Sequence, residues 1–272
     1  MAHLFQSLLK RRARALGSRP RIVRRFGRDW LIDPSDQLDL RLWAGRDIEP
    51  KARDALVRLG RRSRATMFFD IGANAGCYAM TLADALPDLT QVHAFEPAGA
   101  TYARLVANLW LNGLVYRVET HRLALGARNE QATLFTPAGV SGGASLARET
   151  AQKATKALVE QVRVRRFDDL FELENENLLF KIDVEATEDA VIEGMRRTLS
   201  ANRCALQIEV FPNRADRITT LLSGLGLEPI GAIGRDRYFT NMPQFTVGWT
   251  PQAVPEPDAS DARAATRPVA PA

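Results

Sequence analysis

Short hydrophobic runs alternate with amphipathic stretches from residue 66 onward, and this alternation predicts the architecture of the chain. Four runs have the length and continuity of strands that are buried on both faces. They lie at residues 66–70, 91–95, 178–184 and 205–211. After the first run, apolar side chains recur at helical spacing at Ala79, Leu82, Ala83 and Leu86. Strands that alternate with helices form right-handed βαβ units, so we predict an α/β fold with a mostly parallel sheet.

Weaker patterns predict the remaining elements. Helical spacing of apolar residues indicates helices near residues 102–112, 191–199 and 214–225. Extended stretches are expected at residues 115–125, 132–136 and 161–167, with a polar, helix-like segment before the last of them and two β-rich pieces near Tyr238 and Val247. Parallel sheets bind ligands beyond the carboxyl ends of their strands. We therefore expect the functional residues at 70–76, 96–99, 183–188 and 209–213.

The turn after the first predicted strand has the composition of a ligand-binding loop. Gly72 and Gly76 allow the backbone to approach a ligand, and the start of the next helix offers free N–H groups. The spacing G-x-x-x-G differs from the G-x-G-x-x-G of dinucleotide-binding turns, and Asp70 stands immediately before it. A negative charge at this place repels a pyrophosphate and attracts an ammonium or sulfonium group.

Glu96 ends the second predicted strand, 26 residues after Asp70, where a carboxylate can accept both hydroxyls of a ribose. The ligand described by these residues carries an adenosine and a positive charge but no phosphate, and S-adenosylmethionine fits that description. An alternative stays open, in which Asp70 caps the helix and the two glycines only form a tight turn. Glu96 alone does not discriminate, because NAD-binding sheets place an acid at the same position.

Acidic residues also mark the ends of later strands. Alternation along residues 178–184 places Asp183 and Glu185 on one side of the chain. If the ligand is S-adenosylmethionine, its methyl group is transferred to an acceptor molecule. We predict that Asp183 touches this acceptor or the cofactor, and that Glu185 is the general base that activates a hydroxyl of the acceptor. Alternatively, Glu185 and Glu188 cap the next helix, where acids suit the helix dipole. Glu209 interrupts an apolar strand, which is costly unless the acid is paired or functional, and we expect it to bind the acceptor.

Charge is divided unevenly along the chain. The 272 residues contain 37 Lys and Arg against 32 Asp and Glu, a net charge of +5. Of these, 17 basic and 7 acidic residues lie in residues 1–65, so this segment carries +10 and the remainder −5. Nucleic acid is therefore not the expected partner of the body of the chain. Residues 10–28 hold nine basic side chains and no acid, and are expected to form a solvated arm or to contact an anionic membrane surface.

Other classes of protein are excluded by composition. No apolar run approaches the roughly 20 residues that span a bilayer. Two cysteines cannot form a disulfide framework or a four-cysteine metal site, and no metal ligand set is predicted. His93 and His121 lie in strands among apolar neighbours, where a histidine is expected to be a core residue rather than a ligand. The Pro- and Ala-rich residues 251–272 have little to bury and are expected to be disordered.

Several motifs in order resemble the FkbM family of S-adenosylmethionine-dependent methyltransferases. They are DPSDQLDLRLWAGRDIEP (33–50), FFDIGANAGCYAM (68–80), HAFEPA (93–98), LALG (123–126), LFKIDVEATEDAVIEGM (179–195) and QIEV (207–210). The resemblance covers roughly residues 30–250. One departure is Ala186, where the family usually has glycine, and its methyl group is expected to tighten the turn before the next helix.

The resemblance implies a Rossmann-like, class I methyltransferase sheet of seven strands in the order 3-2-1-4-5-7-6, with one antiparallel strand at the edge. It also implies an inserted β-hairpin formed by residues 132–136 and 161–167. Carried over to this chain, Asp70, Gly72, Asn74 and Gly76 line the methionine and ribose part of the cofactor. Glu96 holds the ribose hydroxyls, and the adenine lies by Pro97, Leu123 and Ala124. Ser145 is expected to reach the acceptor as part of a lid.

These inferences define three segments and one preferred function. We expect a basic arm at 1–29, a methyltransferase domain at 30–250 with a lead-in at 30–65 and a catalytic core at 66–250, and the tail at 251–272. The expected reaction is O-methylation of a hydroxyl on a carbohydrate, glycan or secondary metabolite by a cytoplasmic protein, with residues 1–28 at the inner face of the membrane. The alternatives are an RNA-directed methyltransferase or RNA-binding module that uses the basic arm, and an NAD-dependent oxidoreductase. Residues 182–188 (IDVEATE) lack the Asn/Asp-Pro-Pro-aromatic motif of enzymes that methylate base amines.

Overall fold

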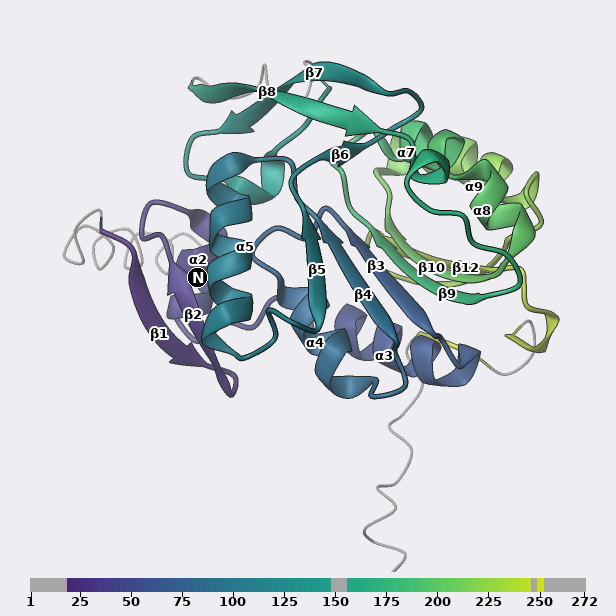
Figure 1. Cartoon of the computed structure of the whole chain (residues 1–272), viewed down its shortest axis with the longest axis horizontal. Coiled ribbons are helices and arrows are strands. Elements are labelled where there is room, and N and C mark those ends of the chain that lie inside the picture. Colours follow the sequence, from purple (N-terminus) through teal and green to yellow (C-terminus); the bar gives the residue numbers. More distant parts are fainter. Residues whose placement is uncertain (1–18, 148–155, 246–248, 252–272) are drawn as a thin grey trace, which may run out of the picture.

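A seven-stranded sheet organises the computed structural model, which describes residues 19–147, 156–245 and 249–251 (Figure 1). The strands are β3 (Met67–Ile71), β4 (Gln91–Phe95), β5 (Val118–His121), β9 (Asn177–Ile182), β10 (Arg203–Glu209), β11 (Glu228–Ile233) and β12 (Asp236–Thr240). Their spatial order from the β5 edge is β5-β4-β3-β9-β10-β12-β11, which confirms the predicted order 3-2-1-4-5-7-6.

The antiparallel strand is not at the edge, as we had expected, but one position inside it. β12 runs antiparallel to β10 on one side and to β11 on the other. The reason is that β11 and β12 form a hairpin and its second strand pairs with β10, so the first strand becomes the edge. β11 had no clear sequence signal, because its six residues include Pro229 and Gly231. The β-rich piece predicted near Val247 lies outside the described residues.

Helices cover both faces of the sheet because its strands are apolar on both sides. Phe68 and Phe69 are consecutive in β3 and point into two different core clusters. One cluster includes side chains of α3 (Pro50–Ser63), α4 (Cys77–Ala85) and α5 (Gly99–Leu111). The other includes side chains of α7 (Glu188–Gly194), α8 (Arg196–Ala201) and α9 (Ala215–Ser223). The single helix expected at 191–199 is two helices, α7 and α8, which meet at Met195.

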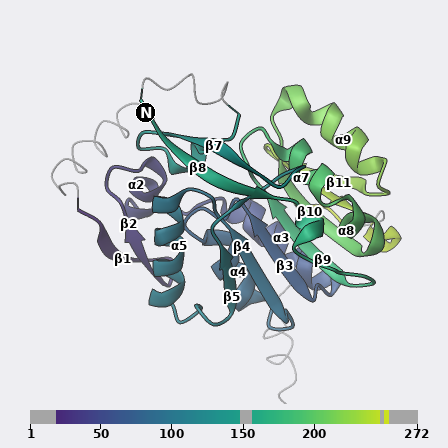
Figure 2. The ribbon, with the colours of Figure 1, turned by 45° about the horizontal axis from the view of Figure 1, so that its top comes forward.

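A second, three-stranded sheet lies beyond the carboxyl ends of β3, β4 and β5 (Figure 2). It consists of β6 (Ala124–Leu125), β8 (Ala157–Arg165) and β7 (Glu130–Pro137) in that order. The pairing of β7 with β8 confirms the predicted hairpin, with longer strands than expected. The single extended stretch predicted at 115–125 is divided, because β5 belongs to the main sheet and β6 to the small one. The helix-like segment expected before β8 falls largely in residues that the structure does not describe.

The lead-in folds onto the body of the protein as a hairpin and two helices. The hairpin is formed by β1 (Arg21–Arg25) and β2 (Arg28–Ile32), and α2 (Gln37–Trp43) follows it before α3. Asn108 of α5 accepts the N–H of Leu31 at 2.7 Å and donates to the carbonyl of Ala75 at 2.9 Å. The hairpin crosses position 29, where we had placed the end of the arm, so the folded body begins earlier than expected. Residues 1–18 and 252–272 lie outside the description, and their predicted roles stay predictions.

Four 3-10 turns complete the described elements: η1 (Ser141–Gly143), η2 (Phe167–Asp169), η3 (Pro212–Arg214) and η4 (Pro243–Phe245). Among the described residues, no helix is both long enough and apolar enough to cross a bilayer.

The turn between β9 and α7 holds two consecutive non-glycine residues in the left-handed region. Glu185 has φ 52° and Ala186 has φ 77°. A residue with a Cβ is destabilised by about 1–2 kcal/mol in this conformation. This is the strain that the sequence suggested at Ala186. The strain is tolerated because the turn is tied at several points, including the N–H of Ala186, which donates to Glu188 at 2.8 Å.

Replacing Ala186 by glycine is expected to stabilise the protein. Glycine removes the strain at φ 77° but adds about 0.4–1 kcal/mol of unfolded-state entropy, so we expect a net gain of about 0.5–1 kcal/mol. Urea unfolding of Ala186→Gly and of the wild type measures the difference in their free energies of unfolding. The matched control is Ala190→Gly, four residues later inside α7, which is expected to lose about 1 kcal/mol. A loss of stability in Ala186→Gly as large as in the control would contradict the strain.

Candidate active site

A cavity of about 380 Å³ opens at the carboxyl ends of the central strands. Its walls come from the turns that follow β3, β4, β5 and β9 and from the end of β10. This is where the chain order reverses, because β3 is flanked by β4 on one side and by β9 on the other. A cavity at such a switch point is the expected ligand site of an open parallel sheet.

The roof of the cavity comes from two segments that are distant in sequence. α2 contributes Gln37, Leu38 and Arg41, and the η1 loop contributes residues 140–144. Asp36 joins them, because its side chain accepts the N–H of Ser141 at 2.7 Å and that of Leu38 at 3.0 Å. Sequence reasoning did not assign these residues to the site, since no local pattern shows that α2 lies against the loop before β8.

The turn after β3 is shaped by a close approach to β9. Gly72 has φ 84°, and a Cβ at this position would lie 1.8 Å from the carbonyl oxygen of Asp183. Only glycine therefore fits here. The N–H groups of Gly72 and Ala73 both donate to the carbonyl of Phe95, at 3.0 and 2.9 Å, which fixes the turn to the end of β4.

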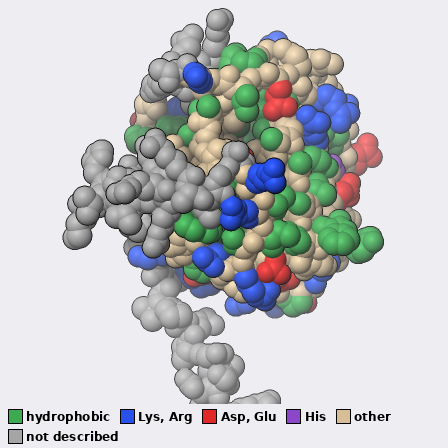
Figure 3. Space-filling model, turned by 90° about the vertical axis from the view of Figure 1, so that its left-hand side faces the viewer, with side chains coloured by type: hydrophobic (Ala, Val, Ile, Leu, Met, Phe, Trp, Pro, Cys, Tyr) green, Lys and Arg blue, Asp and Glu red, His purple; other side chains and the backbone are tan. Residues whose placement is uncertain are grey.

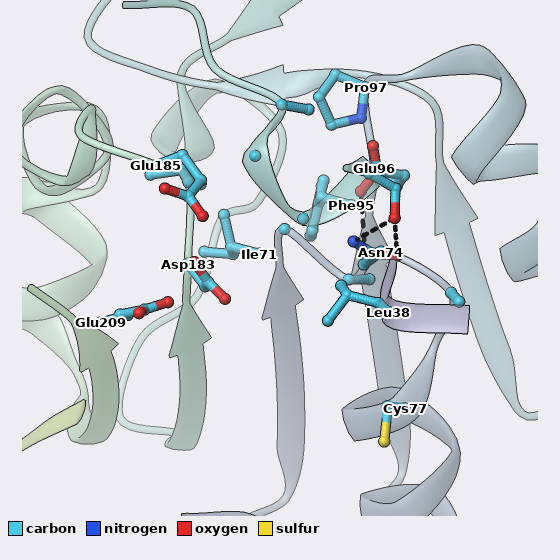
Figure 4. Close-up of a pocket in the computed structure, with 18 of the residues that line it drawn as sticks. Leu38, Ile71, Asn74, Cys77, Phe95, Glu96, Pro97, Asp183, Glu185 and Glu209 are labelled. Carbon is cyan, nitrogen blue, oxygen red and sulfur yellow. Dashed lines mark hydrogen bonds between the residues drawn. The ribbon is translucent and has the colours of Figure 1, made fainter. Parts of the chain in front are cut away.

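Glu96 and Asn74 lie together on one wall of the cavity, as Figure 4 shows. The Glu96 carboxylate accepts the N–H of Asn74 at 3.0 Å and the N–H of Ala98 at 2.9 Å. Burial nevertheless raises the pKa of Glu96 to about 7. Each oxygen keeps a lone pair, so the carboxylate can accept two further hydrogen bonds from a ligand.

The wall beside Glu96 is apolar. Phe95, Pro97, Leu123 and Ala124 line it, and all but Pro97 are buried. Leu123 and Ala124 reach it because the chain turns from β5 into β6 at this point. The predicted positions Gly72, Asn74, Glu96, Pro97, Leu123 and Ala124 therefore all border one cavity.

Asp70 and Gly76 do not line the cavity, contrary to our expectation. Asp70 is fully buried, and one carboxylate oxygen accepts the N–H of Ala79 in the first turns of α4 at 2.9 Å. Burial raises its pKa to about 6, although the charge of Lys181 opposes the shift. Gly76 directly precedes α4. The alternative that Asp70 holds the helix start is thus the one that the geometry supports, because the side chain points into the core behind the turn.

Three carboxylates meet on the opposite wall. Asp183, Glu185 and Glu209 each place an oxygen within 4.8 Å of the others (Figure 4). Strand alternation is not the reason for the proximity of Asp183 and Glu185, since β9 ends at Ile182 and Glu185 is left-handed. The tight turn after β9 brings them together instead.

Two cations set the charge of this acidic group. Lys181 lies 2.8 Å from Asp183 and is buried, and the guanidinium of Arg235 contacts the carboxyl group of Glu209. Burial favours the neutral form of Asp183, but the charge of Lys181 and a hydrogen bond from Glu209 outweigh it and lower the pKa of Asp183. Burial and the neighbouring Asp183 raise the pKa of Glu209 to about 9, so Glu209 carries the proton that the two acids share.

Glu185 has an intermediate proton affinity. Burial, followed by the negative charge of Asp183, raises its pKa to about 7. It lines the cavity together with Asp183 (Figure 4). A carboxylate that titrates near neutral pH is suited to proton transfer.

Lys181 was not predicted as a site residue, although its signal was present. A lysine inside the apolar run 178–184 is as costly as the acid Glu209 in β10, and the same argument applied to both. The amine also lies 4.8 Å above the ring of Tyr78, whose hydroxyl donates to Glu49 at 2.9 Å. Tyr78 and Glu49 border the cavity too, and neither was predicted.

Ser145, which we expected to reach the acceptor, does not line the cavity, although its neighbours Ala144 and Leu146 do. It is buried, and its hydroxyl donates to the carbonyl of Glu185 at 2.6 Å and accepts the N–H of Ala147 at 3.0 Å. These bonds hold the strained turn that carries Glu185.

Three solved structures illustrate the similarity of this chain to known proteins. A methyltransferase from Geobacter sulfurreducens is 18% identical with a TM-score of 0.44, over 75% of this chain and 85% of that one. Precorrin-6y C5,15-methyltransferase from Geobacter metallireducens is 12% identical with a TM-score of 0.41, over 69% and 85%. M. jannaschii TYW2 in complex with AdoMet is 13% identical with a TM-score of 0.40, over 81% and 83%.

The comparison with family models is decisive. A search of curated proteins found no match. The Methyltransferase FkbM domain, in contrast, matches residues 70–245, which is more than half of the chain. The matched range begins at the end of β3 and contains β4, β9 and β10 with the turns that wall the cavity. The chain therefore belongs to the FkbM methyltransferase family.

Proposed function

We propose that this S-adenosylmethionine-dependent methyltransferase methylates a hydroxyl oxygen of a carbohydrate, glycan or secondary metabolite. The observation that carries the proposal is Glu185, a cavity carboxylate whose pKa of about 7 suits it to take a proton from a hydroxyl.

The cavity residues fit the cofactor. Glu96 presents a carboxylate with free lone pairs, as the two hydroxyls of a ribose require. Phe95, Pro97, Leu123 and Ala124 form an apolar wall for the adenine beside it. The ionised Asp183 provides negative charge on the opposite wall, where the sulfonium would lie. When bound, S-adenosylmethionine supplies a methyl group on a positively charged sulfur.

Each acid of the opposite wall then has its own task. Glu185 would accept the proton of the acceptor hydroxyl, and the bound cofactor would supply the methyl group that replaces this proton. Asp183, kept ionised by Lys181, holds the acceptor or the sulfonium by charge. Glu209 is protonated and can bind the acceptor by donating or accepting a hydrogen bond. Most of the remaining rate enhancement can come from alignment in the cavity.

The structure offers little support for RNA as the acceptor. Arg24 pairs with Asp29, Arg28 pairs with Asp84, and Arg25 donates to the carbonyl of Trp43. Three of the basic side chains of residues 10–28 are therefore already partnered within the fold. On the visible part of the face that bears the β1–β2 hairpin, basic side chains are scattered among hydrophobic and acidic ones (Figure 3).

The proposal is tested by methyl transfer to competing acceptor classes. Labelled S-adenosylmethionine is incubated with the full chain and, separately, with simple and lipid-linked sugars, hydroxylated small molecules, RNA and protein. We expect the label on a hydroxyl oxygen of a sugar or small molecule. Labelling of RNA or protein alone would contradict the proposed acceptor class while leaving the methyltransferase assignment intact.

Removing the charge of Glu96 is expected to weaken cofactor binding. Hydrogen bonds to a charged group contribute about 1.5–3 kcal/mol, so the Kd of S-adenosylhomocysteine should rise about tenfold to a hundredfold in Glu96→Gln. Isothermal titration calorimetry measures it. The matched control is Glu130→Gln, an exposed acid in β7, which should bind as wild type does. Equal affinity of Glu96→Gln and wild type would remove Glu96 from the cofactor site.

Cofactor affinity is also expected to decrease as the pH is lowered. The ribose hydroxyls need the ionised form of Glu96, whose pKa without ligand is about 7. Binding to the carboxylate lowers this pKa, so affinity is lost as pH falls below about 7. Between pH 8 and pH 6 the ionised fraction drops about tenfold, and the Kd should rise by about that factor. Glu96→Gln should show a flatter profile; an unchanged profile would assign the titration to another group.

Glu185→Gln is expected to separate chemistry from binding. Without a base, kcat should fall about 10²–10⁴-fold, while the Kd of S-adenosylhomocysteine stays close to that of wild type. In the wild type, kcat should increase as the pH rises through about 7, because Glu185 ionises in this range. In the variant, this increase of kcat with pH should be absent. Glu193→Gln, a partly exposed acid of α7 outside the cavity, is the control. Full activity of Glu185→Gln on the acceptor would exclude it as the base.

A further inference from the structure

A group of titratable side chains lies outside the cavity, on the outer two strands of the main sheet. His93 of β4 pairs in register with Glu119 of β5, and Phe95 pairs with His121. Side chains two residues apart share a face of the sheet, so His93, Glu119 and His121 project to the same side. The methyltransferase site uses none of their side chains.

The donor atoms of these residues are spaced as metal ligands are. Nδ1 of His93 lies 3.1 Å from Nε2 of His121. In the Glu119 carboxylate, Oε2 lies 3.6 Å from Nδ1 of His93 and Oε1 lies 3.7 Å from Nε2 of His121. Two nitrogens bound tetrahedrally at the usual Zn–N distance are about 3.3 Å apart, so both imidazoles already have the required separation. Small rotations of the exposed Glu119 side chain shorten the distances from its carboxylate oxygens to the two nitrogens.

A further residue orients the first imidazole toward this point. The side-chain oxygen of Gln91 lies 3.0 Å from Nε2 of His93 and can only accept a hydrogen bond. Nε2 therefore carries the proton, and the lone pair of Nδ1 is directed at His121 and Glu119. A hydrogen bond to the outer nitrogen of a histidine is the usual support of a metal ligand.

The surroundings hold both rings in place while leaving a path for an ion. Phe69 stacks on His93 with centroids 5.1 Å apart, and Phe95 stacks on His121 at 4.5 Å. Burial lowers the pKa of both histidines, and the neutral imidazole is the form that binds metal. Glu119 is 67% exposed, so the third ligand faces solvent and a water can occupy a fourth position.

We propose that His93, Glu119 and His121 bind one divalent transition-metal ion of the zinc type. Two imidazoles and a carboxylate are a donor set that suits zinc. The carbonyl of His121 accepts the N–H groups of Glu96 and Leu123, at 3.1 and 3.0 Å. The bound ion fastens β5 to β4 next to the ribose and adenine walls of the cavity. This site departs from our sequence-based expectation of core histidines and is independent of the proposed methyl acceptor.

Metal titration of the full chain tests the proposal. Tag-free protein, stripped with a chelator, is titrated with Zn²⁺ by calorimetry and with Co²⁺ by visible absorption. We expect one ion per chain and a rise in Tm of about 5 °C at an ion concentration 100 times the Kd. Glu119→Gln, whose exposed side chain is not needed for folding, should weaken binding by at least about tenfold. Gln91→Ala should weaken it by about tenfold through the loss of orientation.

Two controls separate this site from incidental binding. Glu228→Gln removes an exposed acid from the other edge strand, β11, and should bind as wild type does. His3→Ala removes the third histidine of the chain and should have no effect. The proposal is overturned if wild type binds no ion, if Glu119→Gln binds as tightly as wild type, or if His3→Ala abolishes binding.

Discussion

The buried ion pair between Lys181 and Asp183 is the interaction on which the active-site wall depends. Lys181 sits inside the sheet, and removing one partner of such a pair costs about 3–5 kcal/mol, so Asp183 must stay ionised. An ionised Asp183 in turn forces the neighbouring acid Glu209 to hold a proton and raises the pKa of Glu185 toward neutrality. The buried Lys181, together with Arg235, thus sets the protonation states of three adjacent carboxylates.

The two walls of the cavity are coupled through backbone rather than through side chains. The turn after β3 is bound to Phe95 at the end of β4 and approaches Asp183 so closely that Gly72 has no room for a Cβ. Glu96 therefore sits at a fixed place relative to Asp183, although they follow different strands. The roof is fastened to this frame by Asp36 and Ser141, which link α2 to the η1 loop. These contacts together hold the two walls and the roof of the cavity in one arrangement.

Part of this site could be predicted from the sequence because its signals are local. Glu96 and the glycine turn follow buried strands, and the carboxyl ends of parallel strands always meet at one edge of the sheet. Asp70 was misjudged because sequence position does not show whether a side chain at a strand end points toward the ligand or back to the helix. The position of Ser145 outside the cavity could not be predicted, because its partner, the carbonyl of Glu185, lies 40 residues away. His93 and His121 were expected in the core, and their alignment with Glu119 depends on the register of β4 and β5.

The sequence by itself determined the alternation of strands and helices, the strand order through its family resemblance, and the residue types at the strand ends. Hydrophobic periodicity and turn residues carry that information because they act between near neighbours. Only the tertiary structure decided which acids face one another, which carboxylate keeps its proton, and that α2 and the η1 loop cover the cavity. Those outcomes depend on burial and on distances between segments far apart in the chain, and both exist only after the sheet has assembled.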